Sequence, residues 1–186
     1  MNDHLRVRLD AYSQRASAHR QRLRWAAWYV LSVLIFESRW PWPSRIKCAI
    51  LRLFGARIGV GVVIKPNVKI KFPWNLEIGD YVWIGEQVWI DNLDTVVVGS
   101  HVCISQGAYL LTGNHDYKKV TFDLITRPIK IHDGAWIGAR ALIAPGVVIA
   151  DHSVIYAGTV VSKDTEPFSI YQSQSATKIR QRIIQE

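Results

Sequence analysis

Residues 131–161 read IHDGAWIGARALIAPGVVIADHSVIYAGTVV, with an aliphatic residue at every sixth position. Three earlier groups of three follow the same spacing, and the fifth position of each uninterrupted hexad holds Val, Ala, Ser or Thr. The fifteen aliphatic positions are Ile58, Ile64, Ile70, Ile78, Ile84, Ile90, Val98, Ile104, Leu110, Ile131, Ile137, Ile143, Ile149, Ile155 and Val161. A period of six is typical of a β-solenoid, because a helix needs a period near 3.6.

The hexads predict an all-β solenoid over residues 58–166. Each hexad makes one short strand and a turn, three hexads close a triangular coil, and stacked coils bury each other's faces. Coils that start at 58, 78, 98, 131 and 149 give about five coils. Extra residues at 70–77, 90–97 and 110–130 all fall on the third side of a coil. The long loop 111–130 is therefore expected to leave the prism on the side that already carries two shorter bulges.

Residues 1–57 form a basic, Trp-rich arm. They contain 11 Lys and Arg against 3 Asp and Glu, whereas residues 58–186 hold 12 of each, so the arm accounts for the net charge of +8. Residues 25–36 read WAAWYVLSVLIF and form the first predicted helix of the arm, which is shorter than the ~20 residues needed to span a bilayer. A second helix is predicted from Ser44 to Gly55.

Two interpretations of the arm stay open. Its helices pack on the main domain or a neighbouring subunit, or they lie in a membrane interface with Trp among the headgroups and Arg on anionic lipid. Nothing in the arm resembles a nucleic-acid-reading helix or a stacking platform, so no nucleic acid partner is expected.

The remaining composition indicates a folded protein of a reducing compartment. Apolar residues make up 49% of the chain and charged residues 20%, which excludes a disordered protein. Cys48 and Cys103 fit neither a disulfide framework nor a zinc site. No cleavable signal peptide is visible near Met1, so a cytoplasmic location is expected.

The hexads, together with four longer segments, resemble those of a known family. The hexads resemble those of the left-handed β-helix acyltransferases, the hexapeptide acetyltransferases. Four segments resemble acetyltransferases of colanic-acid-type exopolysaccharide synthesis: LRLFGARIGVGVVIKPNVKIKFPWNLEIGD, WIDNLDTVVVGSHVCISQGAYLLTGNHDY, TFDLITRPIKIHDGAWIGARALIAPGVVI and VVSKD. The resemblance implies a left-handed coil, a homotrimer, and acetyl-CoA bound in a groove between neighbouring β-helices.

The resemblance also implies that His115, in the loop segment TGNHDY, is the general base. An acceptor hydroxyl must lose its proton as it attacks a thioester, and imidazole titrates near working pH. Asp91, Asn92 and Asp116 are candidates for orienting the imidazole through its other nitrogen. Asp91 and Asn92 lie one coil below the loop, and their alternative role is to satisfy the backbone of the turn.

The resemblance places the acyl donor after the loop. It assigns Ala139 and Ala157 to the pantetheine arm, Ser162 and Lys163 to the adenine and phosphates, and Trp136 to the groove. Lys163 has an alternative interpretation as a solvated turn lysine. The Gly-Asn-Pro turn usual before the family's C-terminal helix is replaced here by QSQSAT, so the phosphate role of Arg180 departs from the pattern. Residues 167–186 are predicted to form a C-terminal tail with a short helix.

No metal is expected. A zinc site on the same fold would need a histidine pair spaced HxxxxH on adjacent coils, and this sequence has none. His101 and His152 occupy turn positions instead, and His132 follows an aliphatic position.

Large residues at outward hexad positions predict a contact surface. Trp83, Cys103 and Trp136 share one side of the prism, and Trp89 and Tyr109 share the next. A threefold interface would cover them.

These observations predict an O-acetyltransferase that moves acetyl from acetyl-CoA to a sugar hydroxyl in exopolysaccharide assembly. The acceptor is a free sugar, a nucleotide sugar or a lipid-linked saccharide, and the enzyme is cytoplasmic, with peripheral membrane contact through residues 1–57. The alternative is a catalytically silent β-helix that acts as a scaffold or sugar-binding subunit.

Overall fold

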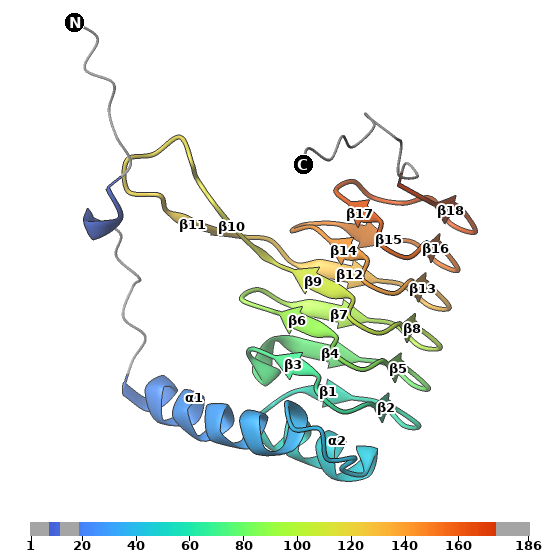
Figure 1. The fold of residues 1–186 in the computed structure, drawn as a ribbon, viewed down its shortest axis with the longest axis horizontal. Coiled ribbons are helices and arrows are strands. Elements are labelled where there is room, and N and C mark those ends of the chain that lie inside the picture. Colours follow the sequence, from blue (N-terminus) through green and yellow to red (C-terminus); the bar gives the residue numbers. More distant parts are fainter. Residues whose placement is uncertain (1–7, 12–18, 174–186) are drawn as a thin grey trace, which may run out of the picture.

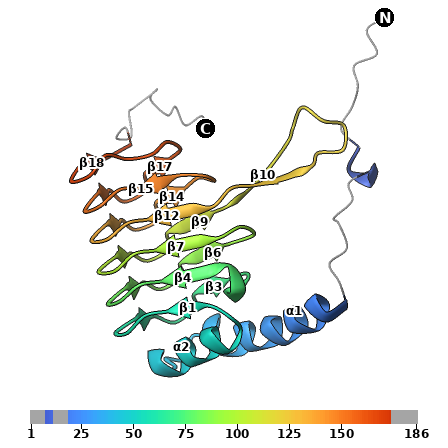
Figure 2. The ribbon, with the colours of Figure 1, turned by 180° about the vertical axis from the view of Figure 1, so that it is seen from behind.

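Three parallel sheets form the walls of a triangular prism (Figures 1 and 2). The structure is a computed structural model that describes residues 8–11 and 19–173. Sheet A contains β1 (Arg57–Ile58), β4 (Leu76–Ile78), β7 (Val96–Val98), β12 (Ile129–Ile131) and β15 (Val148–Ile149). Sheet B contains β2 (Val63–Ile64), β5 (Trp83–Ile84), β8 (Cys103–Ile104), β13 (Trp136–Ile137), β16 (Val154–Ile155) and β18 (Ile170–Tyr171). Sheet C contains β3 (Lys69–Ile70), β6 (Trp89–Asp91), β9 (Tyr109–Leu111), β14 (Leu142–Ile143) and β17 (Val160–Val161).

The hexad positions stack in register through the prism. Ile84 pairs with Ile104, which pairs with Ile137, and all three side chains are fully buried. Successive coils lie one strand spacing apart, about 4.8 Å, so each inward side chain packs on the equivalent one above it. This arrangement confirms the predicted solenoid fold class.

The solenoid has about six coils rather than five. Strand β18 pairs with β16, with Tyr171 opposite Ile155, and therefore begins a sixth coil beyond residue 166. Tyr171 follows Ile155 by 16 residues, whereas Ile155 follows Ile137 by 18. The six-residue period is broken there, which is why the sequence pattern ended one coil too early.

The arm covers the first coil with two helices, α1 (His19–Leu31) and α2 (Ser44–Leu53). A π-helical turn, η2 (Ser32–Phe36), continues α1, and a short 3-10 turn, η1 (Leu9–Ala11), precedes it. Trp28, Phe36 and Leu51 are buried against the end of the solenoid. Among the described residues, no helix combines the length and the hydrophobicity needed to cross a membrane.

Three arm side chains also satisfy the exposed edge of the first coil, one on each sheet. Along the strands each coil donates its backbone N–H groups to the next coil, as Gly59 N does to Ile78 O. The strand carbonyls at the edge of the first coil therefore have no partner in the second coil. Their partners come from the arm: Arg52 donates to Gly59 O at 2.8 Å, Lys47 to Lys65 O at 2.8 Å, and Trp28 Nε1 to Ile70 O at 2.9 Å. An open edge of this kind would otherwise pair with another chain. Burial lowers the pKa of Lys47.

All three extra segments lie between a sheet C strand and the next sheet A strand, as predicted. The first contains a 3-10 turn, η3 (Pro73–Asn75). The third contains two antiparallel strands, β10 (Gly113–His115) and β11 (Leu124–Thr126), which form a hairpin that projects from the prism (Figure 1).

Candidate active site

His115 is the last residue of β10, at the start of the tip of the projecting hairpin. It pairs with Leu124 across the hairpin, and its backbone N–H donates to Asn114 Oδ1 at 2.8 Å. The sequence predicted a long loop over residues 111–130, and part of that loop is a β-hairpin. Backbone pairing fixes where the imidazole leaves the chain.

Phe122 holds the imidazole of His115 by two contacts. Its carbonyl oxygen lies 2.8 Å from His115 Nδ1, and its ring stacks on the imidazole with centroids 4.4 Å apart and planes 8° apart. A carbonyl oxygen can only accept a hydrogen bond, so Nδ1 carries the proton and the neutral ring has its lone pair at Nε2. Phe122 adopts a left-handed φ of 51°, which is unfavourable for a bulky residue.

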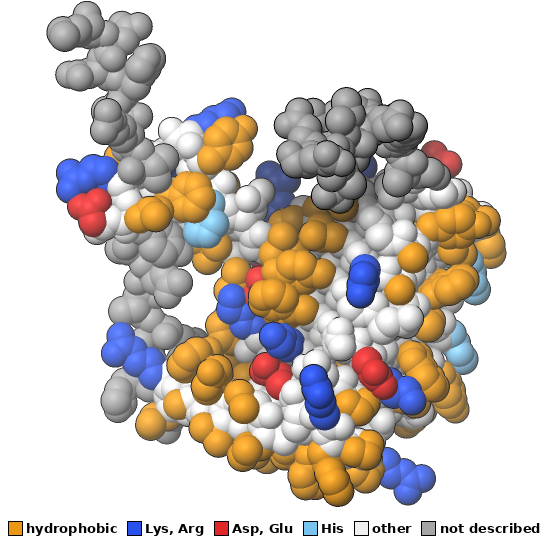
Figure 3. Space-filling model, in the orientation of Figure 1, with side chains coloured by type: hydrophobic (Ala, Val, Ile, Leu, Met, Phe, Trp, Pro, Cys, Tyr) orange, Lys and Arg blue, Asp and Glu red, His pale blue; other side chains and the backbone are white. Residues whose placement is uncertain are grey.

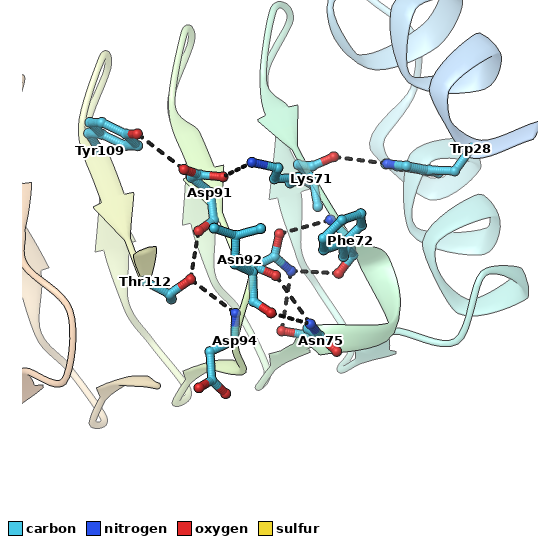
Figure 4. A network of polar contacts seen from close by, with 11 residues as sticks. Trp28, Lys71, Phe72, Asn75, Asp91, Asn92, Asp94, Tyr109 and Thr112 are labelled. Carbon is cyan, nitrogen blue, oxygen red and sulfur yellow. Dashed lines mark hydrogen bonds and ion pairs between the residues drawn. The ribbon is translucent and has the colours of Figure 1, made fainter. Parts of the chain in front are cut away.

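Asn92 does not supply the partner that the sequence analysis sought for His115. The side chain is fully buried and is directed toward the first coil (Figure 4). Its Oδ1 accepts from Phe72 N at 3.0 Å, and its Nδ2 donates to the carbonyls of Phe72 and Asn75. Both amide hydrogens therefore bind backbone carbonyls of the first extra segment and hold the second segment against it. Asn92 thus has the alternative role given above, which is to satisfy the backbone of a turn. The partner seen at Nδ1 is a backbone carbonyl from the other arm of the hairpin, and no sequence motif marks it.

Asp91 belongs to a polar network on sheet C. Lys71 Nζ lies 2.9 Å from Asp91 Oδ1 in an ion pair, and Tyr109 donates its hydroxyl to Oδ2 at 3.3 Å (Figure 4). Burial, together with the Asp91 carboxylate, raises the pKa of Tyr109 to about 12. The third candidate, Asp116, accepts from the backbone of Lys118 within the hairpin tip.

A cavity of about 300 Å³ opens at a different edge of the prism. Its lining consists of the two residues that follow each of three sheet B strands, together with nearby side chains. The lining residues are Ser105, Gln106, Trp136, Gly138, Ala139, Ile155, Tyr156 and Ala157. They follow β8, β13 and β16, so the cavity runs along the edge between sheets B and C.

Trp136 forms one wall of this cavity. The indole is 50% exposed, and its Nε1 donates to Ser105 Oγ at 2.9 Å, which fixes the ring orientation. Gly138 lets the next coil approach closely, because a Cβ there would lie 2.5 Å from Ile155 O. Small residues and a held aromatic ring make a narrow groove with accessible backbone, which suits an extended chain with amide groups.

The structure brings together half of the residues predicted to bind the acyl donor. Trp136, Ala139 and Ala157 line the cavity. Ser162 and Lys163 are exposed after β17, on sheet C, and do not line it. Arg180 and the predicted C-terminal helix lie outside the described residues.

Gln106 and Tyr156 also line the cavity, although the sequence motifs did not indicate them. Tyr156 directly follows an aliphatic position of sheet B, and Gln106 follows one by two residues. The hexad register could therefore have identified both.

Two other histidines of the solenoid occupy structural positions. His101 stacks on Tyr81 and His152 on Phe168, and both histidines have left-handed φ angles at turns. In the part of the chain that the structure describes, no three His, Cys, Asp or Glu side chains are grouped so that they could hold a metal ion.

The predicted outward aromatic positions also align. Trp83, Cys103 and Trp136 are neighbours on sheet B, and Trp89 is opposite Tyr109 on sheet C. The rings of Trp89 and Tyr109 stack 4.6 Å apart. Both sheets therefore carry exposed aromatic surface next to the cavity edge.

Comparison with known proteins agrees with this architecture. The family described as Bacterial transferase hexapeptide (six repeats) matches residues 128–163. WcaF of Escherichia coli (strain K12), named as a colanic acid biosynthesis acetyltransferase, is 38% identical over 156 residues, which cover 84% of this chain and 86% of WcaF. The galactoside O-acetyltransferase of the same organism is 31% identical, with 72% of this chain and 68% of that protein covered.

A solved structure shows the same fold. The hexapeptide-repeat-containing acetyltransferase of Vibrio cholerae O1 biovar eltor, determined with acetyl coenzyme A, matches with a TM-score of 0.75 at 25% identity. The match covers 87% of this chain and 88% of that one. Given the hexad solenoid and a 38% identical relative that covers most of both chains, this chain belongs to the hexapeptide-repeat acetyltransferases.

Proposed function

We propose that this acetyltransferase moves acetyl from acetyl-CoA to a sugar hydroxyl during exopolysaccharide assembly, with His115 as the general base. The observation that carries the proposal is the contact between His115 Nδ1 and Phe122 O. It assigns the Nδ1 proton and makes Nε2 the basic nitrogen.

In this reaction His115 accepts one proton from the acceptor hydroxyl and later donates it to the sulfur of CoA. Nε2 takes the proton of the acceptor hydroxyl as that oxygen forms a bond to the thioester carbonyl carbon. The carbon–sulfur bond then breaks, and the imidazolium returns the proton to the sulfur. The products are an acetyl ester and CoA thiol, so atoms and charge balance.

The cavity supports the placement of the acyl donor. Its backbone at Ala139 and Ala157 is accessible, and Trp136 offers a flat apolar wall, which together fit a pantetheine arm. Ser162 and Lys163 remain proposed contacts for the nucleotide end. Asp91 and Asn92 keep a supporting role, as parts of the bulges beneath the hairpin.

A homotrimer is part of the proposal, because one chain does not hold the whole site at one edge. The cavity lies between sheets B and C, whereas the hairpin leaves between sheets C and A. A neighbouring copy would bring its hairpin to the cavity edge. Contact through the exposed aromatic rows of Trp83 and Trp89 would leave each site shared by two chains.

The names of the relatives support a saccharide acceptor. One relative is named for colanic acid biosynthesis and another for galactoside O-acetylation. We place the reaction in the cytoplasm, where acetyl-CoA is available, and include contact of residues 1–57 with the membrane.

The first test is thiol release from acetyl-CoA with a panel of mono- and oligosaccharides. His115→Ala is expected to lower kcat by about 10²- to 10⁴-fold, whereas His152→Ala, which removes a stacked turn histidine, leaves it unchanged. Equal rates for wild type and His115→Ala would remove His115 from the mechanism. Absence of thiol release with every acceptor would favour the silent scaffold.

The second test is complementation. His115→Ala and the cavity-blocking Ala157→Trp are each expected to be inactive alone. Coexpressed in equal amounts, they should recover about one quarter of wild-type activity, since a shared site is intact when an unaltered hairpin meets an unaltered cavity. No recovery from mixed trimers would place the site within one chain.

A further inference from the structure

The outer face of α1 is apolar although it is exposed. Its inner face buries Trp28 on the solenoid. The opposite face of α1 carries Leu23 and Val30, and η2 continues it with Val33 and Leu34; Val30 is 56% and Leu34 60% exposed. A helix that is apolar on both faces is normally covered on both. Figure 3 shows hydrophobic side chains along this underside of the arm.

The exposed surface of the arm also carries positive charge. Arg22, Arg39 and Arg45 are exposed, and none forms an ion pair with another described residue. Glu37 is the only carboxylate between residues 19 and 57, and it accepts a hydrogen bond from the buried Ser32 at 3.1 Å. Nothing acidic therefore balances the arginines on the outer face.

The geometry of the prism limits what covers this face. Trimerisation through the sides of a prism leaves its ends free, and the arm closes one end. A second copy docked face to face would place arginines opposite arginines, which is unfavourable. Anionic headgroups match the charge, and their boundary with the acyl chains accepts Val, Leu and Trp side chains. Trp40, 68% exposed beyond η2, fits that boundary.

We propose that the outer face of α1 and η2, with Arg39 and Arg45 beside it, binds the surface of an anionic lipid bilayer and holds the solenoid upright on it. Exposed Ile46 and Leu53 extend the apolar surface along α2. Parallel trimer axes would bring three such faces to one plane and strengthen binding. This last point rests on the proposed trimer, whereas the binding face itself does not.

The upright orientation sets the height of the candidate base. Strand β9, where the hairpin leaves, lies two strands above β3, which is about 10 Å. The hairpin rises from β9 away from the arm (Figure 1), so His115 lies further from the headgroups than β9 does. A saccharide on a lipid carrier would have to extend at least that far from the bilayer to be acetylated, an extension that rests on the proposed function.

The test is flotation of the full chain with vesicles of phosphatidylcholine and phosphatidylglycerol at 7:3, or of phosphatidylcholine alone. Wild type is expected to float with the anionic vesicles in 0.1 M NaCl and to remain below in 0.5 M NaCl or without phosphatidylglycerol. Val30→Glu/Val33→Glu should lower the partition coefficient by about 100-fold, tenfold for each valine. Arg39→Gln/Arg45→Gln should lower it by about 25-fold, fivefold for each arginine.

The control is Ile170→Glu, which puts one glutamate, rather than two, on an exposed apolar residue (65%) at the other end of the solenoid. It should float like wild type. Wild type that stays unbound, or Ile170→Glu that loses as much binding as the double valine variant, would overturn the proposal. Thiol release with a soluble acceptor should be unchanged in the valine variant, which separates failure of membrane binding from failure of catalysis.

Discussion

Phe122→Ala removes the ring that stacks on His115 and leaves in place the backbone carbonyl that accepts from Nδ1. The imidazole should keep its tautomer and lose the stacking contact that helps to orient it. We therefore expect kcat to fall while the KM for acetyl-CoA stays constant, because Phe122 is not among the residues that line the cavity.

The size of the effect follows from the geometry. The rings are nearly parallel, 8° apart, with centroids 4.4 Å apart, and such a pair contributes about 0.5–1.5 kcal/mol. Complete loss of that energy from the transition state lowers kcat by about 2- to 13-fold. This is far less than the 10²- to 10⁴-fold loss expected for His115→Ala.

A glycine variant separates orientation from backbone strain. Phe122 has φ 51°, a conformation that costs residues with a Cβ about 1–2 kcal/mol. Phe122→Gly should lose the stack as alanine does but unfold about 2–4 °C higher than Phe122→Ala, since its free energy of unfolding is about 1 kcal/mol larger. Thermal unfolding of the two variants at one protein concentration checks this.

The solenoid supplies a matched control. Phe168 also has a left-handed φ, 54°, and stacks on His152 at 4.9 Å and 18°. Phe168→Ala therefore makes the same chemical change far from the hairpin and should leave kcat within twofold of wild type. If Phe122→Ala kept full kcat, or if both variants lost activity equally, the stack would not position His115.

Two further predictions concern the first coil and sheet C. Trp28→Phe leaves the buried Ile70 carbonyl without its donor and should destabilise the chain by about 2–3 kcal/mol, or about 4–12 °C in Tm, whereas exposed Trp40→Phe should shift Tm by less than 2 °C. Burial and Asp91 raise the folded-state pKa of Tyr109 from 10 to about 12. The protonated phenol therefore contributes fully to the free energy of unfolding below pH 10, and this contribution is lost between about pH 10 and 12. The free energies of unfolding of wild type and Tyr109→Phe, measured by denaturant titration at a series of pH values, should diverge across that range. If they changed in parallel with pH, the raised pKa of Tyr109 would be contradicted.

Some features of the site were readable from the chain. The hexad register places Ile84, Ile104 and Ile137 in one stack and the segment 111–130 on the third side of the prism, and the structure has both. His115 stands out as a polar, titratable residue where the repeat stops. Most of the lining of the cavity follows from the same register, since six of its eight residues come directly after sheet B strands.

Other features depend on contacts that no local pattern records. The sixth coil is reached after 16 residues instead of 18, so a fixed period cannot find it. The arm side chains Trp28, Lys47 and Arg52 reach carbonyls up to 42 residues away.

The sequence by itself determined the solenoid, its faces and the side on which the base emerges, because a six-residue period states which side chains turn inward. Only the tertiary structure decided how His115 is held and where the cavity lies relative to it. Its partner is the carbonyl of Phe122, a group that every residue carries and that hairpin pairing alone brings to Nδ1. Backbone groups leave no trace in the identity of a residue, so their contacts appear only when the chain is folded.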